Sequence, residues 1–355
     1  MRCPRQICGA PMQAVALALE HLRRGGVVVL ADHGGAQLVA ADASDLLARH
    51  GVGETRHPGA AEPVSTGGVL DHEAPAEAAV DLMRLAGLAP QAVMRALAAP
   101  DAPAFARAQG LPLVSVVDVI QHRLRTETML DYVAVADLPT AFADRPFRAH
   151  SFLSRLDGVE HLALVSPGQA KGAPLVRVHS ECLTGDAFGS LRCDCGPQLH
   201  ESMRRLAQTE GGILVYMRGH EGRGIGLANK MRAYALQDQG LDTVEANRAL
   251  GLPDDARDFA QAAQMLRALG HEAVRLLSNN PEKAASLQRH GITVTKVEPL
   301  VMPPNPFNAK YLETKAQKFG HALPLPEPMP GMGSLRRHFR VTTIAHSPLG
   351  LAWEL

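Results

Sequence analysis

Three cysteines near the middle of the chain carry the clearest chemical signal. Cys182, Cys193 and Cys195 are spaced C-x10-C-x-C within HSECLTGDAFGSLRCDC, residues 179–195. Three thiolates that leave a fourth position open are typical of a catalytic zinc, whose open position supplies a nucleophile near neutral pH. Two alternatives stay open at this point: a structural zinc closed by His179 or His200, and three unrelated buried cysteines.

A glycine-rich segment, RGHEGRGIGL at residues 218–227, is the second signal. It lies between a predicted strand and a predicted helix, and its four glycines let backbone amides approach an anion. Arg218 and Arg223 add positive charge beside those amides. The segment predicts a phosphate-binding loop, although it is not a P-loop because no G-K-[ST] follows. A turn with a purely structural role is the alternative.

A third segment, PDDARDF at residues 253–259, places acidic residues before a predicted helix. The functional interpretation makes Asp255 a proton acceptor beside Arg257. The alternative is that Asp254 and Asp255 cap the helix, which acidic residues in this place often do.

A fourth segment, LLSNNPEK at residues 276–283, runs from a strand end into a helix start. Ser278, Asn279 and Asn280 therefore lie where α/β proteins bind ligands, beyond the carboxyl end of a strand. A helix N-cap followed by Pro281 explains the same residues and is compatible with a ligand role.

Strands and helices alternate along the chain, which predicts an α/β architecture with two domains. The first domain is expected over residues 1–135, a linker over 136–150, the second domain over 151–320 and a tail over 321–355. The predicted helices are 11–24, 76–86, 196–208, 223–240, 258–269 and 281–289, and the predicted strands are 27–30, 113–117, 162–165, 176–178, 212–216 and 273–277. A loop is expected over 53–68 and a late strand within RRHFRVTTIAH.

The composition excludes several protein classes. Equal numbers of basic and acidic side chains, 36 of each, exclude a general nucleic-acid-binding protein with a broad basic excess, but not a local basic pocket. Five cysteines are too few for a disulfide scaffold, and Cys3 and Cys8 have no predicted role. No apolar run approaches the roughly 18 residues of a membrane span. A cytoplasmic enzyme without nucleic-acid or membrane partners is expected.

The four segments, in this order, resemble GTP cyclohydrolase II, the first enzyme of riboflavin biosynthesis. The resemblance covers roughly residues 150–320 and includes VRVHSECLTGDAFGSLRCDCG, NKMRAYALQDQGLDTVEAN, RDF and SNNPEK. Ser278 stands where the family often has threonine, and the hydroxyl is retained. Motifs of this length in this order favour the functional interpretation of each segment.

The resemblance implies a role for each matching residue. Cys182, Cys193 and Cys195 are expected to bind zinc, Asp255 to accept a proton, Arg257 to attack the α-phosphate, and Tyr234 to lie near the base. The GTP-binding residues are expected to be Arg177, Val178, His179, Ser180, Glu181, Gln198, Glu221, Gly222, Arg223, Thr243, Ser278 and Lys283. Four arginines, Arg177, Arg218, Arg223 and Arg257, are expected to surround one triphosphate.

The reaction that the resemblance implies begins with loss of diphosphate from GTP, assisted by Mg²⁺. Attack at C8 of the guanine by water activated on zinc then opens the ring and releases formate. The product is 2,5-diamino-6-ribosylamino-4(3H)-pyrimidinone 5′-phosphate, and a homodimer is expected. Glu181 or Gln198 is expected to recognise the guanine edge. Two alternatives are a nucleotide-binding relative without catalysis, and a cyclohydrolase with another nucleotide substrate or a formylated product.

Residues 14–125 are similar to 3,4-dihydroxy-2-butanone 4-phosphate synthase, through ALEHLRRGGVVVL and GGVLDHEAPAEAAVDLMRLAGLAPQAVMRAL. The chain departs from that family at its functional positions. The acidic loop that holds Mg²⁺ in the family is here ADHGGAQ, residues 31–37, and one carboxylate is a poor site for a hard cation. The family's Gly-His-Thr-Glu is Ala-Pro-Ala-Glu at residues 74–77, which lacks the histidine. We therefore expect this domain to be inactive as a synthase.

Overall fold

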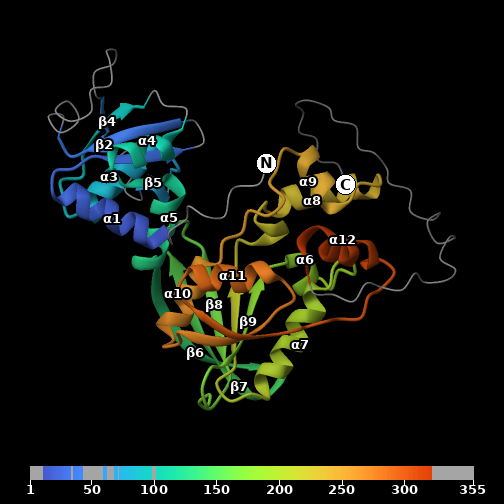
Figure 1. Ribbon diagram of the computed structural model, residues 1–355. Helices are drawn as coiled ribbons and strands as arrows, with labels where there is room; N and C mark the ends of the chain where they lie inside the picture. The colour runs from blue at the N-terminus through green and yellow to red at the C-terminus, as the bar shows by residue number, and fades with distance from the viewer. Residues whose placement is uncertain are drawn as a thin grey trace, which may run out of the picture.

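The computed structural model describes residues 11–32, 35–42, 59–61, 68–70, 72–97 and 101–321, which form two α/β bodies (Figure 1). The predicted fold class, two α/β domains, is confirmed. The predicted tail beyond residue 321, the late strand within it, Cys3, Cys8 and most of the predicted loop 53–68 lie outside the described residues.

The first body is a five-stranded sheet with helices on both faces. Its elements are α1 (Pro11–Arg23), β1 (Val28–Asp32), β2 (Gly35–Ala40), β3 (Gly59–Ala61), the 3-10 turn η1 (Gly68–Leu70), α3 (Pro75–Leu85), β4 (Ala92–Ala96), α4 (Ala102–Gln109), β5 (Leu113–Ser115) and α5 (Val116–Thr126). The strand order is β3-β4-β2-β1-β5, with only the β1–β5 pair parallel. Apolar residues of α1, α3 and α5 fill the core on one face, and those of α4 contribute to the core on the other.

The start of α5 differs from the sequence prediction. A strand was predicted over residues 113–117, but it ends at Ser115, and Val116 is already helical. The Ser115 hydroxyl accepts a bond from the Asp118 amide, while the Asp118 carboxylate accepts from the Ser115 amide. This capping box starts the helix, and it outweighs the strand preference of the valines that follow.

The second body is built on a seven-stranded sheet. Its elements are β6 (Leu130–Thr140), β7 (Ala143–Ser154), β8 (Glu160–Val165), β9 (Leu175–Ser180), α6 (Leu183–Asp186), α7 (Cys195–Ala207), β10 (Ile213–Met217), η2 (Glu221–Arg223), α8 (Leu227–Asp238), α9 (Thr243–Ala249), α10 (Ala260–Ala268), β11 (Ala273–Leu277), α11 (Pro281–Arg289), β12 (Thr293–Glu298) and α12 (Ala309–Phe319). The strand order is β12-β11-β9-β10-β8-β7-β6. One face packs on α10 and α11, and the other on α7.

The strand order reverses at β9. This strand pairs in parallel with β10 on one side and with β11 on the other, so the chain reverses its direction of travel across the sheet at β9. Ligands of open α/β sheets bind beyond the carboxyl ends of the strands at such a reversal. Three of the segments identified from sequence follow these strands. The segment with the three cysteines (residues 182–195) follows β9, the glycine-rich segment (218–227) follows β10, and Ser278, Asn279 and Asn280 follow β11.

The predicted linker over residues 136–150 is wrong. These residues lie in β6 and β7, an antiparallel hairpin that pairs Leu130 with Ser154 and Leu138 with Phe147. Strand β7 also pairs with β8, which makes the hairpin part of the second sheet. The second body therefore begins at Leu130, immediately after α5 ends.

The two bodies meet where α5 packs against α10 (Figure 1). The Gln264 amide of α10 donates to the carbonyls of Leu124 (2.8 Å) and Glu127 (2.9 Å) and accepts from the Met129 amide (2.8 Å). Leu124 and Met129 also pack on Ala260 of the same helix. A buried glutamine thus satisfies the backbone groups at the end of α5, where no helical partner exists.

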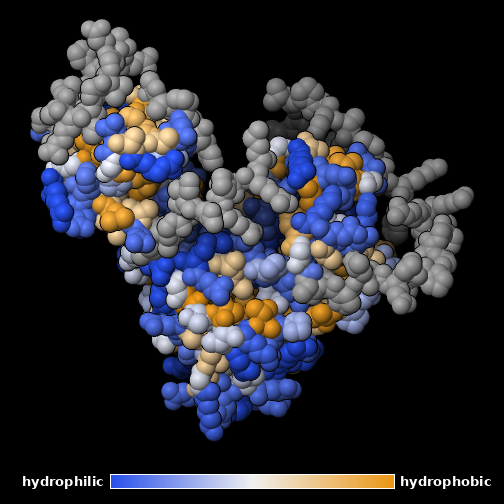
Figure 2. All heavy atoms as spheres, viewed as in Figure 1, coloured by the Kyte–Doolittle hydropathy of each residue, from blue (hydrophilic) through white to orange (hydrophobic). Residues whose placement is uncertain are grey.

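The described surface is largely polar. On the face shown in Figure 2, hydrophilic side chains predominate over both bodies, and apolar side chains appear in small groups. Among the described helices, none combines the length and the apolar character needed to cross a lipid bilayer.

Candidate active site

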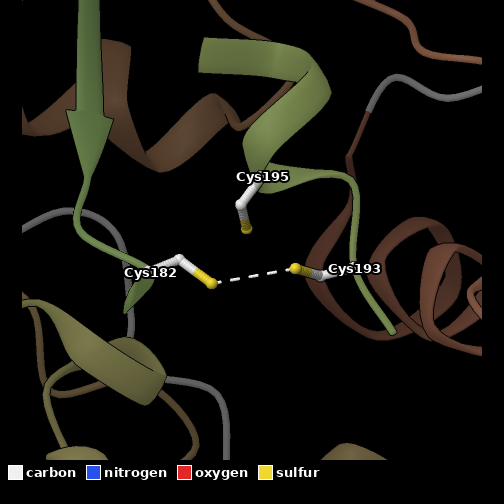
Figure 3. Close-up of side chains that lie close together, drawn as sticks. All are labelled: Cys182, Cys193 and Cys195. Atoms are coloured by element: carbon white, nitrogen blue, oxygen red, sulfur yellow. Dashed lines mark hydrogen bonds between the residues drawn. The ribbon is translucent and has the colours of Figure 1, made fainter. Parts of the chain in front are cut away.

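The three predicted metal-binding cysteines lie together at the carboxyl edge of the second sheet. Their sulfur atoms are all within 4.8 Å of one another, and those of Cys182 and Cys193 are 3.7 Å apart. Cys182 follows β9, while Cys195 is the first residue of α7 (Figure 3). A Cβ atom at Gly185 would lie 2.8 Å from the Cys193 sulfur, so this position between the ligands requires glycine.

Hydrogen bonds to Asp186 fix the turn that carries Cys182. The Asp186 carboxylate accepts a bond from the Cys182 amide (3.0 Å) and one from the Tyr216 hydroxyl (2.9 Å), and it lies 3.1 Å from Nε2 of His179. His179 is therefore engaged with Asp186, while His200 stacks on Phe142 with ring centroids 4.4 Å apart. Neither histidine that the sequence suggested as a fourth ligand joins the cysteine cluster within the described residues.

The electrostatics of the three thiols fit a bound cation. Hydrogen bonds from the other two cysteines, together with the Lys230 ammonium 3.2 Å away, lower the pKa of Cys182. The hydrogen bond with Cys182 raises the pKa of Cys193 to about 11, and the pKa of Cys195 is also raised. The protein by itself thus stabilises one thiolate, and three adjacent thiolates would need a metal ion between them.

The cysteines line a pocket at the ends of β9, β10 and β11. It contains about 1060 Å³ of atom-free space, a figure that includes its open mouth. Sixteen described residues besides the three cysteines were named from sequence as catalytic, substrate-binding or phosphate-contacting, and thirteen of them line it. Those that do are Arg177, His179, Ser180, Glu181, Gln198, Glu221, Gly222, Arg223, Tyr234, Thr243, Arg257, Ser278 and Lys283.

Val178 is an incorrect prediction as a pocket residue. Side chains alternate along a strand, so Arg177 and His179 face the pocket while Val178 faces the opposite core. Its backbone still contributes, because the Val178 carbonyl accepts a bond from Nζ of Lys283 at 2.7 Å.

Buried cations give the pocket its charge. Burial lowers the pKa of Arg177 to about 10; its guanidinium donates to Oε1 of Gln198 (2.7 Å) and to the carbonyl of Leu277 (3.1 Å). Burial, reinforced by the charges of Arg177 and Arg257, lowers the pKa of Lys283 as well. Burial and mutual repulsion disfavour the charged form of these side chains, and a bound anion would stabilise it. This is what a phosphate-binding site is expected to look like before its ligand binds.

The glycine-rich segment forms a compact turn rather than the start of a helix. Glu221–Arg223 is a 3-10 turn, and α8 begins only at Leu227, four residues later than predicted. Gly222 has φ of +60°, and a Cβ there would lie 2.8 Å from Ile225. Glu221 accepts from the Leu183 amide (2.6 Å) and from Lys230 (2.5 Å), which ties the turn to the cysteine segment.

Arg218 does not belong to the predicted arginine cluster. It does not line the pocket, and its guanidinium lies 3.6 Å from the Glu160 carboxylate at the surface. Arg223 does line it, and its guanidinium carbon lies 3.5 Å from the ring centroid of Phe319 in α12. The triphosphate site would therefore use Arg177, Arg223 and Arg257 without Arg218.

Asp255 and Arg257 form an ion pair beside the pocket. Arg257 lines the pocket. Asp255 does not line it, but it forms an ion pair with Arg257. Burial alone would raise the pKa of Asp255, but the hydrogen bonds and charge of Arg257 hold it below its ordinary value. The capping alternative is wrong, because α10 starts at Ala260 and Asp254 instead pairs with Arg248.

Tyr234 and Thr243 enter the pocket from the helices beyond the glycine-rich turn. Tyr234 lies on α8 under the Arg192 guanidinium, whose carbon is 4.9 Å from the ring centroid. Thr243 is the first residue of α9, where the Asp242 side chain caps the helix. Glu181, the residue after β9, accepts a bond from the Gly219 amide at 2.9 Å.

Several pocket residues were not identified from sequence as site residues. They are Arg192, His220, Ile225, Lys230, Ala233, Gln237, Asn247, Tyr311, Lys315 and His321. The last three belong to α12 and its end, a helix that the sequence prediction did not include. The four-residue spacing of Tyr311 and Lys315, which puts them on one helix face, is the signal that was available.

Comparisons with known proteins match both bodies. Residues 131–299 match the family model described as GTP cyclohydrolase II, and residues 36–122 match that of 3,4-dihydroxy-2-butanone 4-phosphate synthase. A crystal structure of RibBX, a two-domain 3,4-dihydroxy-2-butanone 4-phosphate synthase from A. baumannii, has a TM-score of 0.51 at 20% identity. It covers 81% of this chain and 99% of that chain, and at this identity the likeness concerns the fold alone.

Relatives of known name share much more sequence. The riboflavin biosynthesis protein RibBA of Salinispora arenicola is 46% identical over 290 residues, covering 79% of this chain and 69% of the relative. RibBA of Aquifex aeolicus is 46% identical over 264 residues, 72% of this chain and 64% of the relative. The monofunctional riboflavin biosynthesis protein RIBA 3 of Arabidopsis thaliana is 45% identical over 278 residues, 75% of this chain and 54% of the relative.

The chain thus spans about two thirds of the length of these bacterial relatives and about half of the plant one. Its cysteine cluster and basic pocket lie inside the span that matches the cyclohydrolase model, apart from the contribution of α12. The chain therefore belongs to the GTP cyclohydrolase II family of hydrolases in riboflavin biosynthesis, with a domain of the butanone phosphate synthase type preceding the cyclohydrolase domain.

Proposed function

We propose that the chain converts GTP to 2,5-diamino-6-ribosylamino-4(3H)-pyrimidinone 5′-phosphate, formate and diphosphate, with zinc at the three cysteines and Mg²⁺ on the phosphates. The observation that carries this proposal is the position of the three thiols in the wall of a pocket lined by buried cations. A trianionic donor set beside a polyanion site suits a reaction that needs both a metal and a nucleotide triphosphate.

Arg177, Arg223 and Lys283 would bind the phosphates. All three line the pocket, and burial lowers the pKa of each, so the negative charge of the triphosphate would offset an existing desolvation cost. The bidentate geometry of a guanidinium suits phosphate oxygens, and Mg²⁺ would neutralise the leaving diphosphate.

Arg257 and Asp255 would carry out the first chemical step. A guanidinium nitrogen of Arg257 would attack the α-phosphorus, forming an N–P bond as the P–O bond to the diphosphate breaks, and water would later cleave the N–P bond to release the 5′-phosphate. The nitrogen must lose a proton as its bond to phosphorus forms, and the Asp255 carboxylate already accepts bonds from Nε (2.9 Å) and Nη2 (2.5 Å) of this guanidinium. The proton acceptor is therefore in place before the substrate binds.

Cys182, Cys193 and Cys195 would hold the zinc ion, which supplies activated water for the hydrolytic opening of the guanine ring near neutral pH. Lys230 and Gly185 would support this site, by a hydrogen bond to Cys182 and by leaving room between the sulfur atoms. Tyr234 lines the same pocket as the cysteines, and it would contact the base there.

Recognition of guanine would fall to Glu181 and Gln198. Both line the pocket, and each is held by a protein partner, Glu181 by the Gly219 amide and Gln198 by Arg177 and Asp194. A carboxylate or an amide held in one orientation discriminates between bases through paired hydrogen bonds.

The test is product analysis with the zinc-loaded protein, GTP and Mg²⁺. We expect formate, diphosphate and the pyrimidine product in equal amounts, and loss of formate together with bound zinc in Cys193→Ser. Arg218→Ala is the matched control, because this arginine of the same loop lies outside the pocket. Wild-type protein that binds GTP but releases no formate would overturn the proposal, and diphosphate without formate would indicate a formylated product.

We infer that the first body is inactive as a synthase. Within the described residues, the β1–β2 hairpin presents a single carboxylate, Asp32, and the segment before α3 is Ala74-Pro75 in place of a histidine-containing motif. One carboxylate does not make a Mg²⁺ site. Ribulose 5-phosphate incubated with Mg²⁺ should remain unchanged, and formation of a four-carbon phosphate would contradict this inference.

We further propose a cytoplasmic homodimer. Strand β6 forms an outer edge of the second sheet and exposes Tyr132, Val133, Val135 and Leu138. An exposed apolar edge strand is a site for self-association. Light scattering that gives the mass of one chain at assay concentration would contradict the dimer.

A further inference from the structure

Helix α12 (Ala309–Phe319) reaches into the pocket from outside the span that matches the cyclohydrolase model, which ends at residue 299. Three of its contacts hold it in place. Lys310 donates to the Gly240 carbonyl (2.8 Å), Lys318 pairs with Asp242, and Phe319 lies under the Arg223 guanidinium. The helix is thus anchored on both sides of the α8–α9 turn and on the glycine-rich segment by contacts that do not involve Lys315.

Lys315 of this helix is buried against the metal-binding loop. Its ammonium donates to Oδ1 of Asp194 at 2.6 Å, and both side chains are less than a tenth exposed. Asp194 lies between the ligands Cys193 and Cys195, 121 positions earlier in the chain. A carboxylate buried to this degree requires a cation, and α12 supplies it.

The bonds continue from Asp194 to the GTP-binding residues. Oδ2 of Asp194 accepts from Nε2 of Gln198 (2.6 Å), and Oε1 of Gln198 accepts from Nη2 of Arg177 (2.7 Å). A carboxylate only accepts and a guanidinium only donates, so the Gln198 amide has one possible orientation between them. One N–H and one oxygen lone pair of that amide remain for the substrate.

We propose that Lys315 is a positioning residue of the substrate site, which through Asp194 holds the Gln198 amide with its nitrogen away from Arg177 and its oxygen toward it. Without the lysine, the buried carboxylate would lose the cation that holds Oδ1 and would turn toward another donor, so Oδ2 would no longer fix the nitrogen of the Gln198 amide. This inference rests on the proposed GTP site, and it assigns a role in that site to a helix beyond the matched domain.

The experiment compares Lys315→Met with Gln317→Met, which changes an exposed side chain of the same helix whose amide bonds to Glu313 of that helix. Two quantities are measured: kcat and KM for GTP, and the Kd of the α,β-methylene analogue of GTP, whose binding needs no turnover. Lys315→Met should raise KM and Kd about tenfold, the equivalent of one hydrogen bond to the ligand, with kcat little changed. Gln317→Met should resemble the wild type, and Lys315→Arg should recover part of the loss.

Two further variants separate positioning from charge balance. Lys315→Met combined with Asp194→Asn removes both buried charges, so it should fold well, yet it should keep the raised Kd because an asparagine accepts either amide orientation. In a Gln198→Ala background, Lys315→Met should raise Kd no further. Wild-type Kd in the Lys315→Met protein, recovery in the charge-free pair, or full additivity with Gln198→Ala would each overturn the proposal. Since Kd needs no turnover, absence of formate release by the wild type would count against the proposed function alone.

Discussion

Arg257 and Asp255, two residues apart, form a two-point ion pair in which Nε and Nη2 of the guanidinium donate to the two carboxylate oxygens. The same guanidinium donates through Nη1 to the Ser180 hydroxyl at 3.3 Å, which fixes its plane against β9. The pair therefore places the proposed nucleophile and its proposed proton acceptor on one short segment, and the bond to Ser180 orients that segment toward the pocket.

Asp255→Asn should separate binding from catalysis. The amide keeps the size of the side chain but no longer accepts a proton, so kcat should fall by about 10²–10⁴ while KM for GTP changes little. Formate and diphosphate release, measured in parallel, should fall together because the first step is impaired. Asp254→Asn is the matched control, since Asp254 forms an exposed pair with Arg248 and does not line the pocket. A normal kcat in Asp255→Asn would remove Asp255 from the mechanism.

Lys230 should control how tightly zinc is held. Its ammonium donates to the Cys182 sulfur (3.2 Å), to Thr184 (2.8 Å) and to Glu221 (2.5 Å). Loss of a hydrogen bond to a metal ligand typically weakens metal binding about 10–100-fold, and we expect this of Lys230→Met in a chelator competition assay. Lys230→Met alone would leave Glu221 buried without its cation. The double variant Lys230→Met with Glu221→Gln removes both charges and should therefore fold more stably. Unchanged zinc affinity in that double variant would contradict the prediction.

The sequence was informative where local chemistry determines the structure. Strand β11 and helix α11 have the predicted bounds because apolar residues end at Leu277, Asn280 caps the helix and Pro281 starts it. The cysteines were likewise identifiable, since their spacing already limits them to one short loop. Residue types and spacing along the chain were sufficient for these features.

Structure that depends on distant parts of the chain was not predictable in this way. The β6–β7 hairpin was taken for a linker because residues 136–140 of the edge strand β6 and residues 143–150 of β7 are mostly exposed or half-buried and lack an alternating apolar pattern. Pro139 is tolerated there because an edge strand has one unpaired side. The Lys315–Asp194 pair joins residues 121 positions apart, and no spacing rule brings them together.

Two half-buried histidines, His220 and His321, should make folding sensitive to acid. Burial and the nearby charges of Arg257 and Lys283 lower the pKa of His220 to about 3, and burial with the charges of Lys315 and Arg223 does the same for His321. Their unfolded pKa is 6.5, so between about 6.5 and 3 the unfolded chain binds more protons than the folded one. Stability is therefore full above this range and falls with pH, by about 1.4 kcal/mol per pH unit for each histidine.

Urea unfolding of the metal-loaded protein from about pH 7 to about pH 5 checks this, because the slope of unfolding free energy against pH gives the protons taken up. His220→Gln and His321→Gln should each flatten the slope, and the double variant should flatten it by the sum. Thiolate protonation adds to the slope in all these proteins and cancels in the comparison. Parallel slopes for the wild type and both variants would mean that these histidines titrate alike in the folded and unfolded chain.

Gln264 should couple the first body to the catalytic segment. Its side chain satisfies three backbone groups at the end of α5, while its helix, α10, begins three residues after Arg257. Gln264→Leu keeps the volume but leaves those groups buried without partners, at a cost of about 1–3 kcal/mol for each that water cannot reach. We expect faster hydrogen exchange at the α5 amides and a lower free energy of unfolding.

Gln261→Leu, one turn earlier, removes a glutamine whose partners Ser154 and His161 belong to the second body, so α5 should exchange as in the wild type. Equal exchange at α5 in the two variants would mean that apolar packing on Ala260, and not Gln264, holds the bodies together.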